Sequence, residues 1–178
     1  MIIIGTDRIS RYIKLEDLYI TYETLKMLMR ISEEDKFEYI GLIKHNNNRY
    51  IKLSEETPII EMYKGKSTDS PALLPKEELS QFDKAVLNFH THPYGKGKVN
   101  SEEPSNEDCS AFGGLLLSTG ARFHAVISKD KIIILDFSDV KQSQVRECYE
   151  KNNSCECMKE IGVKKYILDG TEDILLVS

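Results

Sequence analysis

The chain of 178 residues contains no long apolar run. Its apolar stretch at residues 1–4 ends at Gly5 and is too short for a signal peptide or a membrane span. We therefore expect a soluble, cytoplasmic protein with no membrane partner. The length suits a single domain, residues 1–178, which can bury a core of its own.

An excess of positive charge is also missing. The chain has 24 lysines and arginines against 29 aspartates and glutamates, which gives a net charge of -5 and a pI near 5.5. The two signs are interspersed along the chain, so the sequence lacks the basic stripe that is typical of nucleic-acid surfaces. We expect no DNA or RNA partner.

Cysteine is scarce, with four residues in the chain. Three of them lie in one short segment: Cys148, Cys155 and Cys157. They lack the paired spacing of a zinc ribbon, and without a secretory signal we predict free thiols rather than a disulfide framework. A second metal site or a redox pair is the alternative. Cys109 is predicted to lie in a helix core, because it shares a helical face with Phe112 and Leu116.

Histidine is equally scarce, but His90 and His92 are separated by one residue only. The apolar run at residues 85–89 before them predicts a buried strand. Residues two apart on a strand share a face at a spacing of roughly 6.6 Å, so both imidazoles can reach one metal ion. Taken alone, a His-x-His pair is more often packing or chance. His45 and His124 lack such neighbours and are predicted to be surface or packing residues.

Asp108 offers a third ligand. The segment 104–108 reads as a helix start, with Asp108 in the first turn, where the helix dipole favours an ionised carboxylate. Catalytic zinc typically takes three protein ligands and a water, so His90, His92 and Asp108 leave one position open. Ser105 and Asp108 also fit a capping box, which by itself indicates no more than a helix start.

Glu38 is the candidate general base that a hydrolytic zinc site needs. It stands at the start of a second apolar strand, residues 37–43. The alternative is an ordinary charged residue at a strand edge after the acidic turn at 33–35. Gly41 favours the functional interpretation, because a glycine inside a strand often marks close approach of a ligand or of another backbone.

In this order along the chain, the motifs resemble the signature of the JAMM metalloproteases, also called MPN-plus domains: Glu38-x-x-Gly41, His90-x-His92-Pro93 and Ser105-x-x-Asp108. Members of that family cleave isopeptide bonds to ubiquitin or ubiquitin-like proteins. The resemblance covers about residues 18–137 and implies the MPN fold, a mixed central sheet flanked by helices and similar to the cytidine deaminase fold. Residues 138–178 lie beyond it and are expected to form a C-terminal extension.

The resemblance implies a role for each residue of the signature. It implies His90, His92 and Asp108 as the ligands of one catalytic Zn²⁺. It implies Glu38 as the acid/base and Ser105 as a hydrogen-bond donor to the developing oxyanion. The expected substrate is a ubiquitin-like protein or its conjugates, cut at the C-terminus of the modifier.

The segment between the second histidine and the serine departs from the family pattern. Twelve residues, 93–104, separate His92 from Ser105, which is longer than is usual in the family. The extra residues at 94–103 are glycine-rich and polar, typical of a surface loop that leaves the ligands at its ends undisturbed. This loop is expected to border the site, so the choice of modifier or peptide stays open.

The order of helices and strands predicts an α+β fold with a central mixed sheet and helices on its faces. An amphipathic helix is predicted at 21–31, after a short N-terminal strand. The remaining predicted elements are strands at 37–44 and 49–53, extended chain then loop at 57–75, a short helix at 76–82, the strand and helix of the metal site, a hairpin of 123–127 with 131–137, a helix at 139–150, and strands at 165–168 and 174–177.

Two other functions stay open at this point. Many MPN domains are non-catalytic scaffold or binding modules, although those typically lack the metal ligands. The same scaffold can also carry a different zinc hydrolase, such as a deaminase-like or small-peptide amidase activity. The sequence does not determine the oligomeric state or the need for an activating partner.

Overall fold

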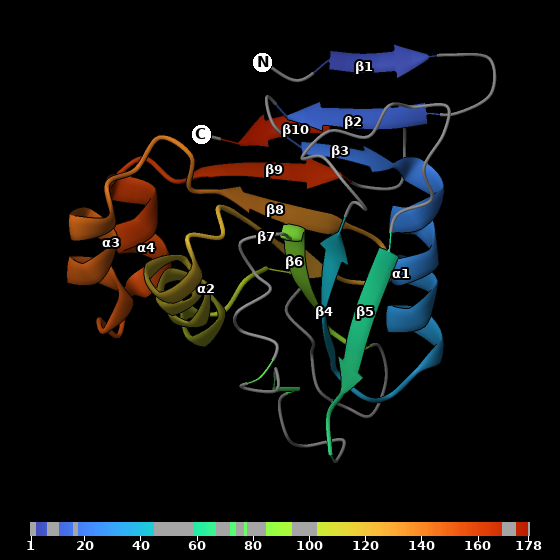
Figure 1. Cartoon of the computed structure of the whole chain (residues 1–178), viewed down its shortest axis with the longest axis horizontal. Helices are drawn as coiled ribbons and strands as arrows, with labels where there is room; N and C mark the ends of the chain where they lie inside the picture. Colours follow the sequence, from blue (N-terminus) through green and yellow to red (C-terminus); the bar gives the residue numbers. More distant parts are fainter. Residues whose placement is uncertain are drawn as a thin grey trace.

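The helices and strands form an α+β fold (Figure 1), as predicted. The computed structural model describes residues 3–6, 11–15, 18–44, 59–66, 72–73, 77, 85–93, 103–168 and 174–177. Its strands are β1 (Ile3–Thr6), β2 (Arg11–Leu15), β3 (Leu18–Thr21), β4 (Tyr39–Lys44), β5 (Ile59–Lys64), β6 (Ala85–Thr91), β7 (Phe123–Ile127), β8 (Ile132–Asp136), β9 (Lys164–Leu168) and β10 (Ile174–Val177). Its helices are α1 (Tyr22–Glu34), α2 (Asn106–Thr119), α3 (Gln142–Tyr149) and α4 (Ser154–Glu160). Within these ranges, none of the helices combines the length and the apolar character that crossing a membrane requires.

The main sheet has the strand order β10-β9-β8-β7-β6-β4-β5. Its neighbouring strands are antiparallel, except that β6 and β7 run parallel. Parallel neighbours need a crossover connection, which here contains α2. β1, β2 and β3 form a separate antiparallel sheet that contacts α1. The crossover brings α2 back across the sheet after the C-terminal end of β6, where the predicted histidines lie.

The main sheet separates two hydrophobic cores. On β8, Ile134 packs on the side of Leu28 from α1, whereas its neighbours Ile133 and Leu135 pack on the side of Phe112 from α2. Successive residues of a strand point to opposite faces, and every residue of β7 and β8 is buried, so both faces of these strands are covered. The predicted central sheet with helices on its faces is confirmed.

Several predicted elements differ from the observed ones. Ile59–Lys64 form strand β5, which pairs with β4, where extended chain and then loop were predicted for 57–75. Helix α4 was not predicted, because its short sequence has no clear periodicity. The predicted strand at 49–53, most of the predicted helix at 76–82 and His45 lie outside the described residues.

The prediction of free cysteines is wrong, because the four cysteines form two disulfides, Cys109–Cys155 and Cys148–Cys157. Residues two apart on a helix point in nearly opposite directions. From α4, Cys155 therefore reaches α2 while Cys157 reaches α3. With the sulfurs bonded in pairs, no thiolate is left for the second metal site that the sequence had kept open.

Gly113 determines how closely α2 packs against α3 and α4. A Cβ atom at Gly113 would lie 2.7 Å from Met158 Cε and 3.0 Å from Tyr149 Cβ, whereas a Cβ atom at Gly114 would meet nothing within 4 Å. The Met158 methyl can move aside, but the Tyr149 Cβ is attached directly to the backbone of α3. Gly114 therefore serves as a control for Gly113, because it lies next to it in the same helix and has room for a side chain.

We predict that Gly113→Ala lowers the free energy of unfolding by about 1 to 3 kcal/mol, because it overpacks the contact between the helices. Gly114→Ala should instead raise it by up to about 1 kcal/mol, since alanine is the better helix former. Urea denaturation of both variants measures the difference. Equal stabilities would contradict the close packing at Gly113.

Candidate metal centre

His90 and His92 lie at the C-terminal end of β6, and their Nε2 atoms are 3.0 Å apart. The backbone of His90 is held by the ladders to β4 and β7 on either side. His92 follows the strand, but its N–H donates to the Ile127 carbonyl at 2.8 Å and its own carbonyl accepts from Ser32 Oγ at 2.6 Å. The backbone at both histidines is thus held by hydrogen bonds to separate elements.

Asp108 lies in the first turn of α2 and takes part in the capping box that the sequence predicted. The Ser105 N–H donates to Asp108 Oδ2 at 2.7 Å, and the Asp108 N–H donates to Ser105 Oγ at 3.1 Å. From there Asp108 Oδ1 lies 3.1 Å from His90 Nε2, and Oδ2 lies 3.3 Å from His92 Nε2. The structure therefore brings together the three residues that were predicted as ligands.

This donor set fits a metal ion. Tetrahedral bonds of about 2.1 Å place neighbouring ligand atoms about 3.4 Å apart, close to the separations of 3.0, 3.1 and 3.3 Å found here. Neutral imidazole nitrogens and a carboxylate oxygen all present lone pairs, so a proton or a cation is needed between them. His90, His92 and Asp108 each offer a ligand atom within 4.8 Å of the other two.

The surroundings keep the Asp108 carboxylate ionised. Burial raises the pKa of Asp108, but hydrogen bonds from His90 and His92 and from the Ser105 N–H hold that pKa well below its usual range. The N-terminal end of α2 favours negative charge as well. An ionised carboxylate is the form that binds a metal, so this residue needs no further activation.

Glu38 directly precedes β4, which is the strand next to β6. Ile40 stands opposite His90 in the ladder of the two strands, and the Tyr39 N–H donates to Thr91 Oγ1 at 3.0 Å. The start of β4 therefore lies beside the end of β6, and Glu38 lies near the histidine pair.

The Glu38 carboxyl is half-buried, and its pKa is raised. Burial is the main cause of the increase, while the charges of His90 and His92 and a hydrogen bond from the Ala72 N–H at 3.3 Å oppose it. Both histidines are therefore close enough for their charges to lower the pKa of Glu38. A carboxyl group with a raised pKa is a stronger base than an exposed one and is better suited to accept and return a proton.

A stack of rings lies behind the histidines. The Phe112 ring centroid is 5.3 Å from that of His90 and 4.6 Å from that of His124. The Ala121 carbonyl can only accept, so His124 Nε2–H donates to it at 3.0 Å and Nδ1 accepts from Asn88 Nδ2 at 2.9 Å. Burial lowers the pKa of His124 to about 3, which keeps the ring neutral. The prediction that His124 is a packing residue is confirmed.

Sequence reasoning missed three buried polar residues that support the site: Ser32, Asn88 and Thr91. Each is almost completely buried, and a buried polar group needs a partner. Ser32 continues the helical face of Leu28, and Asn88 shares a strand face with His90. A polar residue in phase with an apolar pattern was the signal that would have found them. Asn88 Oδ1 accepts no hydrogen bond from the described part of the chain.

Comparison with known proteins identifies no family: no family model matches the chain, and neither a curated protein nor a solved structure matches it significantly. The function is therefore inferred from the residues of the site and their geometry.

We predict that alanine at His90, His92 or Asp108 weakens zinc binding by more than about 100-fold, because two ligands cannot hold the ion that three hold. Glu107→Gln is the matched control, since Glu107 is exposed and lies beside Asp108 in the same turn. Metal content after incubation with zinc and gel filtration, measured by mass spectrometry, tests this. Stoichiometric zinc in an alanine variant would rule out that residue as a ligand.

We predict that His124 makes the protein acid-sensitive. Its pKa is about 3 in the folded protein and about 6.5 when unfolded, so the unfolded state binds more protons between these values. Stability is then complete above about pH 6.5 and falls with pH by up to about 1.4 kcal/mol per unit. His124→Gln cannot titrate and should show a shallower slope between pH 6 and 4. Urea denaturation across this range measures both slopes, and parallel curves would contradict the assignment.

Proposed function

We propose that this protein is a zinc-dependent hydrolase of the JAMM type, with an MPN fold, that cleaves peptide or isopeptide bonds at the C-terminus of ubiquitin-like modifiers. The observation that carries the proposal is the convergence of His90, His92 and Asp108 at metal-binding distances. The half-buried Glu38 beside them and the order of the motifs along the chain support it. The mixed sheet with helices on both faces is compatible with that fold.

Zinc is the metal that this set of donors favours. Two imidazole nitrogens and one carboxylate oxygen are typical of zinc hydrolases, whereas magnesium and calcium prefer oxygen ligands throughout. When bound between His90, His92 and Asp108, zinc supplies a Lewis acid that lowers the pKa of a water molecule to about 7 and polarises the substrate carbonyl.

Glu38 moves the protons of the reaction. It accepts the proton of the attacking water and then delivers it to the departing amine, so one carboxyl serves as base and as acid. Burial raises the pKa of this carboxyl, which makes it a stronger base for the water proton than an exposed carboxylate. The hydrogen bond from the Ala72 N–H to Oε1 holds its orientation.

Ser105 provides a hydrogen-bond donor for the negative charge that develops on the carbonyl oxygen. Its Oγ accepts a hydrogen bond from the Asp108 N–H in the helix cap. That contact does not use the Ser105 O–H, which can therefore donate to the substrate. The N-terminal end of α2 also favours an anion at this position. In measured cases, one such donor contributes about 2.7 to 4 kcal/mol to transition-state stabilisation.

The substrate class comes from the motif resemblance. The segment expected to border the site, 94–103, lies outside the described residues except for Glu103. The Glu103 carboxylate pairs with Lys165 and Lys131, so the end of this segment is tied to strand β9 and to the turn between β7 and β8.

We predict that Glu38→Gln retains zinc but lowers the turnover number by about 10² to 10⁴-fold, because the amide cannot accept a proton. Cleavage of a ubiquitin-like protein fused through its C-terminal Gly-Gly to a reporter measures turnover. Glu34→Gln is the matched control, since Glu34 is an exposed carboxylate at the end of α1.

A chelator should abolish cleavage by the unsubstituted protein, and added zinc should restore it. Wild-type turnover in Glu38→Gln would refute the assignment of the base. Cleavage that persists after zinc has been removed would refute the metal-dependent mechanism as a whole.

A further inference from the structure

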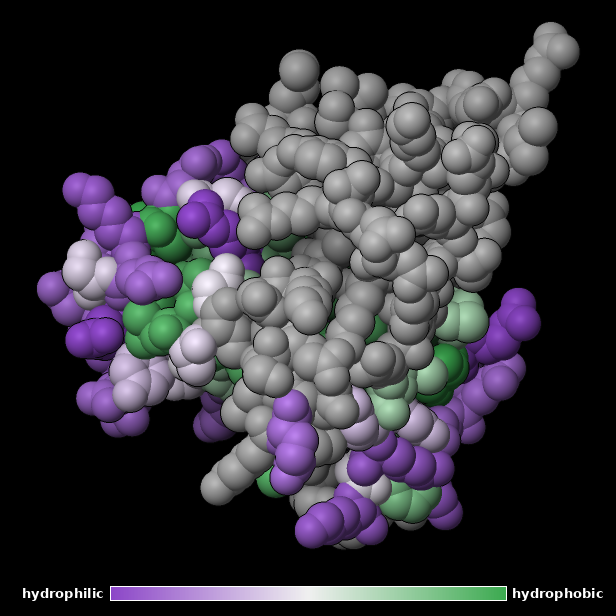
Figure 2. Space-filling view, viewed as in Figure 1, coloured by the Kyte–Doolittle hydropathy of each residue, from purple (hydrophilic) through white to green (hydrophobic). Residues whose placement is uncertain are grey.

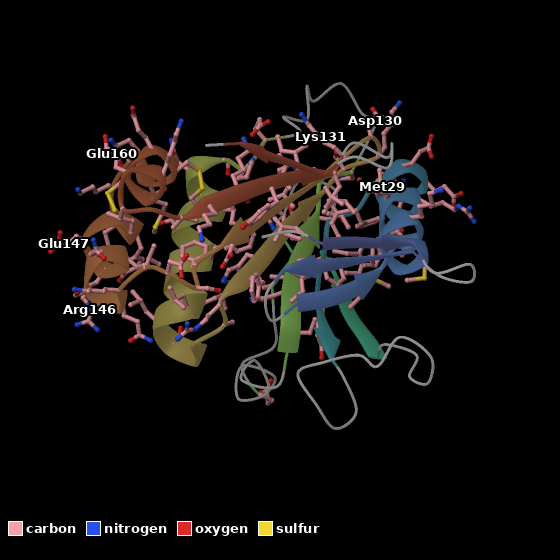
Figure 3. The ribbon with its side chains drawn as sticks, turned by 90° about the horizontal axis from the view of Figure 1, so that it is seen from above. Met29, Asp130, Lys131, Arg146, Glu147 and Glu160 are labelled. Atoms are coloured by element: carbon pink, nitrogen blue, oxygen red, sulfur yellow. A yellow bond between two sulfur atoms is a disulfide. The ribbon has the colours of Figure 1, made fainter. Side chains whose placement is uncertain are left out.

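We propose that the Cys109–Cys155 disulfide is a thiol–disulfide exchange site, that a dithiol reductant is its reaction partner, and that opening it weakens the metal centre. The four cysteines lie at the junction of α2, α3 and α4 (Figure 3). The effect on the metal rests on the proposed function, whereas the exchange reaction itself does not.

A surface pocket leads to this disulfide. It has a volume of about 570 Å³, within the roughly 300 to 1,000 Å³ typical of small-molecule sites. Both Cys109 and Cys155 line it, together with apolar side chains that include Pro104, Met158 and Val163. Figure 2 shows apolar residues exposed between charged ones on the part of the surface that carries α2, α3 and α4. Cys109 is only 3% exposed, so a small thiol that enters the pocket meets the half-buried Cys155.

The charges around the pocket nearly balance. Lys159, Lys164, Lys165, Glu103 and Glu156 border it, and two of these lysines are ion-paired, Lys164 with Asp139 and Lys165 with Glu103. The thiolate is the nucleophile in disulfide exchange, and this border lacks the excess of negative charge that would repel it.

The two disulfides differ in access. Cys148 and Cys157 are 0% and 5% exposed, and neither lines the pocket. Cys155 is half-buried and faces the pocket. Exchange requires direct contact between the attacking sulfur and one sulfur of the bond, so a reductant meets Cys155 first. Exposed disulfides are also the ones that act as labile or regulatory bonds.

Cys155 ties the C-terminal extension to the first turn of α2. Cys109 directly follows the carboxylate ligand in the sequence, and Cys155 Sγ lies 3.0 Å from the Ser105 carbonyl oxygen. The Cys155 N–H donates to Asn106 Oδ1 at 3.1 Å, and Ser154 Oγ donates to the Asn106 carbonyl at 2.5 Å. The disulfide is thus the covalent part of a contact that holds the capping box in place.

The exchange is balanced in two steps. A thiolate of the reductant attacks Cys155 Sγ and forms a mixed disulfide, while the bond to Cys109 breaks and its electron pair leaves with Cys109, which takes a proton. The second thiolate of the reductant then attacks the reductant sulfur of the mixed disulfide. This closes a disulfide in the reductant and releases Cys155, which also takes a proton, so two electrons and two protons have passed to the protein.

Opening the bond removes the covalent link between α4 and the first turn of α2 and leaves hydrogen bonds and apolar packing between the helices. The turn that carries Ser105 and Asp108 then has more conformational freedom, and binding a metal must restrict it again. Groups that orient metal ligands typically change metal affinity by about 10 to 100-fold when they are removed. We expect a loss of about tenfold for this link.

The site of exchange is tested on the unsubstituted native protein. Dithiothreitol is added in steps, new thiols are trapped with N-ethylmaleimide, and labelled peptides are mapped by mass spectrometry. Cys109 and Cys155 should be labelled at least about tenfold faster than Cys148 and Cys157, because of their access. Simultaneous labelling of all four, or earlier labelling of Cys148 and Cys157, would overturn the proposal.

The effect on the metal centre is tested by competition for zinc with a chromophoric chelator. Cys109→Ser/Cys155→Ser should bind zinc about tenfold more weakly than the unsubstituted protein, and the matched Cys148→Ser/Cys157→Ser should differ from it by less than about twofold. Equal affinities of the two double variants would refute the coupling. If the first variant does not fold, protein reduced and alkylated at this pair replaces it. Failure of the unsubstituted protein to bind zinc would refute the proposed function, while the labelling order still decides the exchange site.

Discussion

The half-buried carboxylate of Asp108, held between two imidazoles and its own helix cap, is the interaction on which the site depends. Its side chain is 19% exposed, and an ionised group in such a place is destabilising by several kcal/mol unless it is paired and hydrogen-bonded. The compensation comes from His90 and His92 and from the Ser105 N–H. These partners reach Asp108 only while the start of α2 lies over the end of β6. The parallel pairing of β6 with β7 places it there, because the connection between the two strands contains α2.

Helix α2 is held from two sides. Towards the sheet, Phe112 packs between His90 and His124, so helix α2 and the strand that carries His90 share one core. Away from the sheet, the absence of a side chain at Gly113 lets α3 and α4 pack closely, and Cys109–Cys155 links the first turn to α4. The C-terminal extension therefore supports the site instead of being an independent appendage.

The two carboxyl groups of the site have opposite pKa shifts because their partners differ. Asp108 is surrounded by imidazoles and a backbone N–H, which outweigh its burial and lower its pKa. Glu38 is half-buried with weaker compensation, so its pKa is raised. Pairs of titratable groups whose environments separate their pKa values are typical of acid/base chemistry. The difference suits Asp108 to permanent ligation and Glu38 to proton transfer.

The sequence alone determined what depends on neighbours within a few residues: the strand before His90, the capping box of Ser105 and Asp108, and the hairpin of β7 and β8. The tertiary structure decided the rest. The pairing of Cys109 with Cys155 spans 46 residues, and the bond from Ser32 to the His92 carbonyl spans 60. Contacts of this kind depend on strand order and helix packing, which a local pattern does not encode. The cysteine spacing and the missing secretory signal therefore predicted free thiols, whereas the structure pairs all four cysteines and brings the predicted cluster of His90, His92 and Asp108 together.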